Sequence, residues 1–184
     1  MIGIRNSSLI VGTILILAFL LAECNAYEVS MLTVKEANLS IDLTPDFNVS
    51  YLAIPSAEDA VIGQMIIIND TNNKSNSADL MLLSFSDKSI LEANAKELST
   101  YLENILFGAF KLGGAVEKET YYLTNRYQQN ITIRAMDMPN SKNPTSRELS
   151  YMALWSHDKL NYFFIMSNER SLTNKIVESL EVKD

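Results

Sequence analysis

The sequence is poor in the residue types from which most metal and thiol sites are built. Its 184 residues include one cysteine, Cys24, and one histidine, His157. One cysteine provides no disulfide framework, and a structural zinc site needs several cysteine or histidine ligands. We therefore expect no metal site, no bound cofactor and a fold that is held together by packing alone.

Glycine-rich loops and basic clusters are also missing. The chain has six glycines, and the pair Gly113-Gly114 follows a helical pattern, where it predicts a helix end rather than a phosphate site. The net charge is −7, with no run of lysine and arginine. An acidic chain of this kind is a poor match for nucleic acid, so we expect no nucleic-acid partner.

The ionisable residues suggest two catalytic hypotheses. His157 lies between Ser156 and Asp158, but three adjacent residues in a turn cannot adopt triad geometry, which is assembled from separated positions. Glu117 and Glu119 stand two apart in a strand-like segment, so they are expected to share a face and could form the carboxylate pair of a hydrolase.

A hard cation such as calcium would need oxygen ligands from a suitable loop. Asp70, Asp79 and Asp87 flank the polar segment 69–79 and are the candidate ligands. No loop with EF-hand spacing is present, so the sequence favours a solvated loop over a cation site.

The N-terminal segment has the pattern of a secretory signal. Arg5 precedes an apolar run of 14 residues, Leu9–Ala22, which is shorter than the ~20 residues of a membrane-spanning helix. Three outcomes remain open. The chain is cleaved after Ala26, or Cys24 carries a lipid, or the run stays as an uncleaved anchor. Glu23 argues against the lipid, because the residue before a lipid-modified cysteine is usually Gly, Ala or Ser. We expect residues 1–26 to be this signal or anchor and residues 27–184 to form one domain.

Asparagine is frequent, and the pattern Asn-x-Ser/Thr recurs in residues 27–184. Five asparagines are possible N-glycosylation sites: Asn38, Asn48, Asn69, Asn73 and Asn130. With a secretion signal, this pattern is typical of a glycoprotein that lies outside the cytoplasm.

Short alternating runs separated by polar turns predict mainly strands. The expected strands are 28–34, 38–43, 47–54, 60–69, 80–86, 115–126, 129–137, 147–156 and 160–167. Two segments have helical spacing, a long one at 90–110 and a short one at 169–181. Because strands come in blocks rather than alternating with helices, the sequence predicts an α+β fold, an antiparallel sheet flanked by one long and one short helix.

This order of elements resembles the PsbP-like family, which includes an extrinsic photosystem II subunit and uncharacterised secreted prokaryotic proteins. The resemblance rests on "LSIDLTPDFNV", on the long helix after the first strands, and on the ending "ELSYMALWSHDKLNYFFIMS" with "LTNKIVESLEV". The family's Gly-Trp after the proline is replaced here by Asp46-Phe47. The resemblance implies a PsbP-like fold and a scaffolding or binding role.

Three functions follow as hypotheses. The first is an exported, non-catalytic accessory or binding protein, secreted or at the cell surface, that docks on another protein of a membrane or cell-surface complex. The alternative is a small-ligand carrier or sensor, with a ligand between the long helix and the sheet near Tyr121, Tyr122 and Trp155. The second alternative is the carboxylate-dependent hydrolase. The sequence does not indicate an oligomeric state.

Overall fold

The structure is a computed structural model. It describes residues 27–29, 33–34, 38–43, 46–54, 61–73, 76–85, 88–140, 143, 145–158 and 160–183. The predicted signal, Cys24 and the cut after Ala26 lie outside these ranges, as does Asp87. The predicted division into a signal and one domain therefore stays a prediction.

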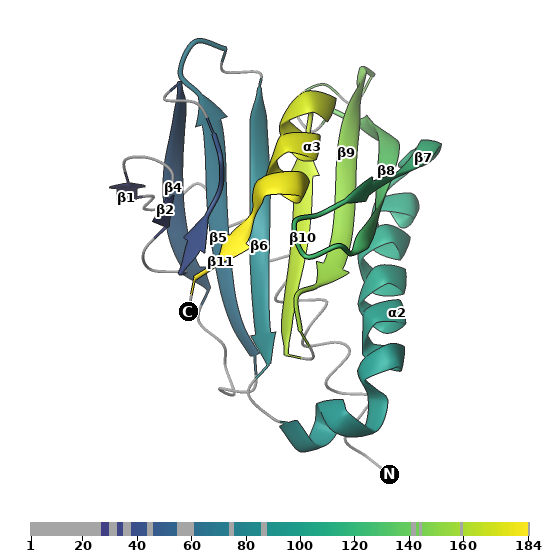
Figure 1. Ribbon diagram of the computed structural model, residues 1–184. Coiled ribbons are helices and arrows are strands. Elements are labelled where there is room, and N and C mark those ends of the chain that lie inside the picture. Colours follow the sequence, from purple (N-terminus) through teal and green to yellow (C-terminus); the bar gives the residue numbers. More distant parts are fainter. Residues whose placement is uncertain are drawn as a thin grey trace.

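The centre of the structure is one antiparallel sheet of eight strands (Figure 1). In spatial order the strands are β1 (Tyr27–Val29), β4 (Phe47–Ile54), β5 (Val61–Asp70), β6 (Ser77–Phe85), β10 (Asn161–Ser167), β9 (Arg147–Ser156), β8 (Asn130–Pro139) and β7 (Val116–Thr124). A second sheet of three short strands has the order β11 (Glu181–Val182), β3 (Leu39–Ser40) and β2 (Thr33–Val34).

Two helices pack on opposite faces of the large sheet (Figure 1). The long helix is α2 (Lys88–Leu112), and the short helix is α3 (Arg170–Ser179). The turn after α2 is closed by Gly114, whose φ of 89° is a backbone conformation that favours glycine. The predicted α+β class, with one long and one short helix, is confirmed.

The two faces of the sheet have separate hydrophobic cores. On the face of α3, Leu172 and Ile176 pack with sheet residues such as Ile66, Leu80 and Ile165. On the face of α2, Leu102, Leu106 and Phe107 pack with sheet residues such as Met136, Met152 and Phe164. Because successive strand residues point to opposite faces, strands buried on both sides have nearly continuous apolar sequences, as "YFFI" in β10 has.

The structure differs from the expected elements at both ends of the described chain. The predicted strand 28–34 is divided between β1 and β2, which belong to different sheets. The predicted helix 169–181 ends at Ser179, and residues 181–182 form β11 instead. There the backbone turns extended, and the Lys183 N–H donates to the Asn38 carbonyl at 2.7 Å, so pairing with β3 replaces the last helical turn.

Candidate ligand-binding cleft

A small cleft opens on the α3 face of the sheet, and three adjacent strands form its floor. Gln64 of β5 pairs with Leu82 of β6, which pairs with Phe163 of β10. One step along, Ser84 pairs with Asn161. Cross-strand partners point to the same face of a sheet, so all five side chains lie together.

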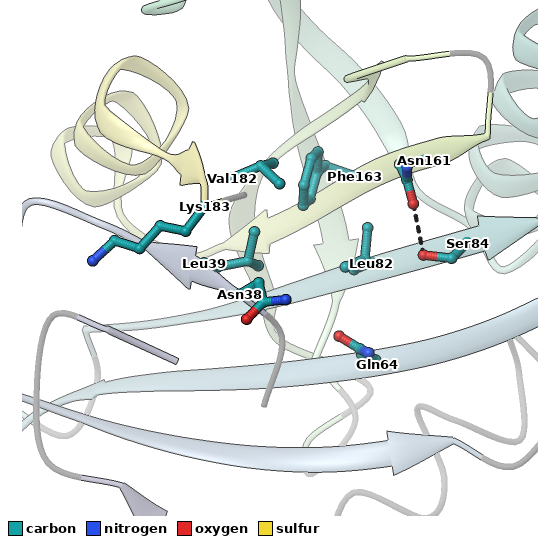
Figure 2. Close-up of a pocket in the computed structure, with 9 residues that line it drawn as sticks. All are labelled: Asn38, Leu39, Gln64, Leu82, Ser84, Asn161, Phe163, Val182 and Lys183. Carbon is teal, nitrogen blue, oxygen red and sulfur yellow. Dashed lines mark hydrogen bonds between the residues drawn. The ribbon is translucent and has the colours of Figure 1, made fainter. Parts of the chain in front are cut away.

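The second sheet forms the other side of the cleft. Asn38 and Leu39 come from β3 and the residue before it, and Val182 and Lys183 come from β11 and the residue after it (Figure 2). Leu39 pairs with Val182 across the short sheet. These two segments are more than 140 positions apart in the sequence. Together with the floor they enclose a cavity of ≈ 210 Å³.

The floor contains one polar atom that has no partner. The Gln64 side-chain oxygen, Oε1, is buried, and no donor in the described part of the chain lies within hydrogen-bonding distance of it. It is on the side of the amide that faces the other lining residues (Figure 2). Leaving a buried acceptor unpaired costs about 1–3 kcal/mol. A ligand with a hydrogen-bond donor would remove this cost.

The other polar floor residues are held in a short chain of hydrogen bonds. The Ser84 hydroxyl donates to Asn161 Oδ1 at 2.8 Å (Figure 2), and Asn161 Nδ2 donates to Asp158 Oδ2 at 2.7 Å. Partial burial of Asp158 acts to raise the pKa of its carboxyl. Hydrogen bonds from Asn161 and from the Leu160 N–H outweigh that effect and hold the pKa below its usual range. Asp158 therefore stays ionised and fixes the orientation of Asn161.

The short sheet is tied to the turn between β7 and β8. The Val182 N–H donates to the Tyr127 hydroxyl at 2.9 Å, and Arg126 forms an ion pair with Glu181 at 2.9 Å. The Tyr127 ring lies 4.7 Å from the His157 ring. His157 is half-buried in this contact rather than exposed, and it packs with aromatic residues in the hairpin between β9 and β10.

The structure does not bring the predicted ligand face together. Tyr121 is half-buried on the α3 face, where its hydroxyl donates to Asn174 at 2.8 Å and the Arg170 guanidinium lies 4.2 Å from its ring centre. Tyr122, the next residue along β7, points to the other face and is 63% exposed. Trp155 lies on the α3 face, away from the long helix, and its ring packs 5.3 Å from the Phe163 ring. Trp155 therefore lies beside the floor of the cleft, on the strand next to Phe163 and on the same face of the sheet.

The proposed carboxylate pair is split by a β-bulge. The register shifts between Glu117 and Glu119, so they pair with the consecutive residues Met136 and Ala135 and point to opposite faces. Glu117 binds Arg134, and Glu119 binds Arg170. A hydrogen bond from Thr120 is the largest cause that holds the pKa of Glu117 below its usual range. The expectation that the two glutamates share a face was wrong.

The acidic residues near the loop 71–76 are also separated. Asp70 lies on the α3 face of β5, and its carboxylate accepts the backbone N–H groups of Asn72 and Asn73. Asp79 lies on the α2 face of β6, where burial raises the pKa of its carboxyl to about 6. Among the described residues, no three acidic, histidine or cysteine side chains lie close enough to hold a metal ion.

All five predicted glycosylation asparagines are exposed: Asn38, Asn48, Asn69, Asn73 and Asn130. Asn48 and Asn69 are direct partners across β4 and β5. Asn38 has a positive φ of 50° and also lines the cleft. Exposure allows modification at each position, and the modification itself stays a prediction.

Sequence reasoning missed Gln64, although a signal was present. Residues 60–68, "AVIGQMIII", are apolar apart from this one amide, a pattern typical of a strand that is buried on both faces. A single amide inside a central strand needs a partner, because burial of an unpaired polar group is costly. The other cleft residues had no local signal, since the cleft joins residues 38–39 to residues 182–183.

Comparisons with known proteins give a likeness of fold. No protein-family model matches the chain, and no curated protein matches it. A solution structure of cyanobacterial PsbP from Synechocystis is similar, with 9% sequence identity, a TM-score of 0.44, and coverage of 86% of this chain and 91% of the other. Fold does not specify function, so the function is argued from the cleft.

Proposed function

We propose that the chain is a non-catalytic binding protein whose ligand site is the cleft between β5, β6, β10 and the short sheet. The observation that carries this proposal is that Gln64, a residue of the cleft floor, has an unpaired side-chain oxygen, Oε1. Ligand pockets use placed polar groups to orient a ligand and apolar side chains to pack against it, and the lining of this cleft offers both. A protein that binds a ligand keeps such an acceptor at a cost to its own stability, because the ligand needs it.

The alternative hydrolase has less support from the geometry. Its carboxylate pair is divided between two faces of the sheet, and each glutamate is held by an arginine. The separation and pairing of Glu117 and Glu119 suit edge-strand solubility and sheet stability rather than attack on one bond.

Export and docking form the second part of the proposal. The apolar run Leu9–Ala22 and the five exposed sequon asparagines support a place outside the cytoplasm. Within the described ranges, no helix is long and apolar enough to span a membrane. Exposed large apolar side chains support docking on a protein partner at the cell surface or membrane. The most exposed of these side chains is Leu112 at the end of α2, at 92%, and Val116 and Leu149 are 49% and 41% exposed.

A thermal-shift screen tests the binding function. Wild type and Gln64→Leu are compared against small molecules that are neutral, anionic, cationic or apolar. We expect at least one class to raise the melting temperature of wild type and to leave the variant unchanged. Equal responses of the two proteins, or no response of wild type to any class, would refute the proposal.

Native mass spectrometry of protein extracted gently from its own cells tests export and docking. We expect a chain with a processed or lipidated N-terminus, glycans on sequons, and a protein partner that is lost in Leu112→Glu. Tyr101→Glu serves as the control, because Tyr101 is an exposed apolar residue that lies earlier in the same helix. An unprocessed, unmodified chain without a partner would contradict both parts.

A further inference from the structure

The residues that line the cleft indicate which chemical class of ligand it binds. This inference rests on the proposed binding function. The floor presents hydrogen-bond acceptors. Gln64 Oε1 is unpaired, and Ser84 has used its only hydroxyl hydrogen on Asn161, so the oxygen of Ser84 can only accept from the cleft. The molecule that fills this floor must therefore donate hydrogen bonds.

The rim of the cleft adds a side chain that can both donate and accept hydrogen bonds. Asn38 lines the cleft and is exposed, and its side-chain amide carries both an acceptor oxygen and donor hydrogens. A ligand whose groups both donate and accept can bond to the floor and to the rim together. Hydroxyl groups do both, whereas an ammonium group only donates and a carboxylate only accepts.

Charge plays little part in the lining. Lys183 is the only ionisable residue among the nine that line the cleft, and its side chain extends away from the other eight (Figure 2). The nearby carboxylate of Asp158 already accepts three hydrogen bonds, from Leu160 and Asn161. Neither an anion nor a cation meets an opposite charge inside the cleft, so a neutral molecule is favoured.

The volume of the cleft and its apolar surface also limit which ligands fit. The volume of ≈ 210 Å³ lies below the roughly 300–1,000 Å³ of pockets for drug-sized ligands. Phe163, Leu39, Leu82 and Val182 offer apolar surface beside the polar atoms. A small ring or chain with C–H groups on one side and hydroxyls on the other matches the volume and the mixed apolar and polar lining.

We infer that the cleft binds a small, neutral, polyhydroxylated molecule of monosaccharide size or below. In the bound state the half-buried Gln64 amide turns toward the cleft so that a ligand hydroxyl donates to Oε1. A second hydroxyl meets Ser84 Oγ and the Asn38 amide, and the C–H side lies against Phe163.

A matched set of probes tests this ligand class. D-glucose and myo-inositol are the neutral polyols, glucose 6-phosphate and glucosamine add a negative or a positive charge, and tetrahydropyran keeps a ring without hydroxyls. Binding is followed by saturation-transfer NMR and by the fluorescence of Trp155, which packs against the cleft residue Phe163. We expect saturable binding of at least one neutral polyol and at least tenfold weaker binding of the charged and apolar probes.

Variants locate the binding. Gln64→Leu and Ser84→Ala should each weaken polyol binding by tenfold or more, and circular dichroism and the melting temperature confirm that they fold. Ser150→Ala is the control, because Ser150 is a buried serine on β9 that faces the other side of the sheet. The control should bind the polyol as wild type does.

The outcomes separate this inference from the proposed function. A charged or apolar probe that binds wild type better than the polyols, and is lost in Gln64→Leu, would overturn the polyol inference and leave the binding function in place. Polyol binding that is unchanged in both cleft variants would also overturn the inference. No binding of any class would overturn the inference and the binding function together.

Discussion

Replacing Gln64 by leucine should make the protein more stable. The substitution removes a buried acceptor that has no partner among the described residues and puts an apolar side chain of similar size beside Leu82 and Phe163. An unpaired buried polar group costs about 1–3 kcal/mol. Gln64 as a whole is half-buried, so we expect a gain in the lower part of that range, about 1–2 kcal/mol.

The expected gain can be measured directly. For a domain of about 150 residues, 1 kcal/mol corresponds to about 2–4 °C in melting temperature. The gain should also appear as a higher midpoint in urea with an unchanged slope. The fluorescence of Trp155 reports the transition, because its ring is buried in the core against Phe163.

Gln129→Leu is the matched control. Gln129 is also a half-buried glutamine, but both ends of its amide are partnered. Its Nε2 donates to the Ser156 carbonyl at 2.9 Å, and its Oε1 accepts from Asn125 Nδ2 at 2.8 Å. Loss of these bonds leaves both partners unpaired, so this variant should lose about 1–3 kcal/mol. The same substitution should therefore change stability with opposite signs in strand β5 and in the turn between β7 and β8.

The reasoning is refuted if Gln64→Leu lowers the free energy of unfolding by as much as Gln129→Leu does. That result would mean that the Gln64 oxygen is satisfied in the free protein, and the argument that the site awaits a donor would fail with it. A gain in stability together with loss of ligand binding would be the trade-off expected of a functional polar group in a core.

Three further predictions concern the rest of the described chain. Asp79→Asn should be more stable than wild type by up to about 3 kcal/mol above pH 6, because burial raises the pKa of this carboxyl from 3.8 to about 6 and its ionised form is disfavoured in the folded state. Since the unfolded chain loses this proton at lower pH than the folded protein does, the difference in stability between Asp79→Asn and wild type should grow as the pH rises from about 4 to about 6. A constant difference between their urea midpoints across that range would contradict the raised pKa of Asp79. Asp158→Ala removes the acceptor of the Leu160 and Asn161 N–H groups, so it should lower the free energy of unfolding by about 1 kcal/mol at pH 7. The loss should become progressively smaller as the pH falls through the lowered pKa of the wild-type carboxyl. An equal loss at pH 2 and pH 7 would argue against this role. Leu102→Ala leaves a cavity in the core under α2, where Leu102 is fully buried, and should cost about 2–5 kcal/mol in urea unfolding, whereas Ala109 on the exposed side of the same helix should accept serine with little change.

Local sequence determined most of the elements. The alternation of 147–156 and the apolar run of 160–167 predict strands that the structure confirms as β9 and β10, and the 3–4 spacing of 90–110 predicts the helix α2. These patterns are local because a side chain's direction repeats every two residues in a strand and every 3.6 in a helix. The α+β class followed from the order of those elements along the chain.

Tertiary structure decided the rest. The β-bulge beside Lys118 sends Glu117 and Glu119 to opposite faces, although their spacing alone puts them together. Residues 181–182 leave the helical pattern because β3 offers them hydrogen bonds, and this pairing closes the cleft over Gln64. Pairing between segments more than 140 positions apart depends on how the whole sheet packs, so it cannot be predicted from the local spacing of apolar residues. The sequence by itself therefore determined which segments are strands and helices, and only the folded chain determined which side chains meet.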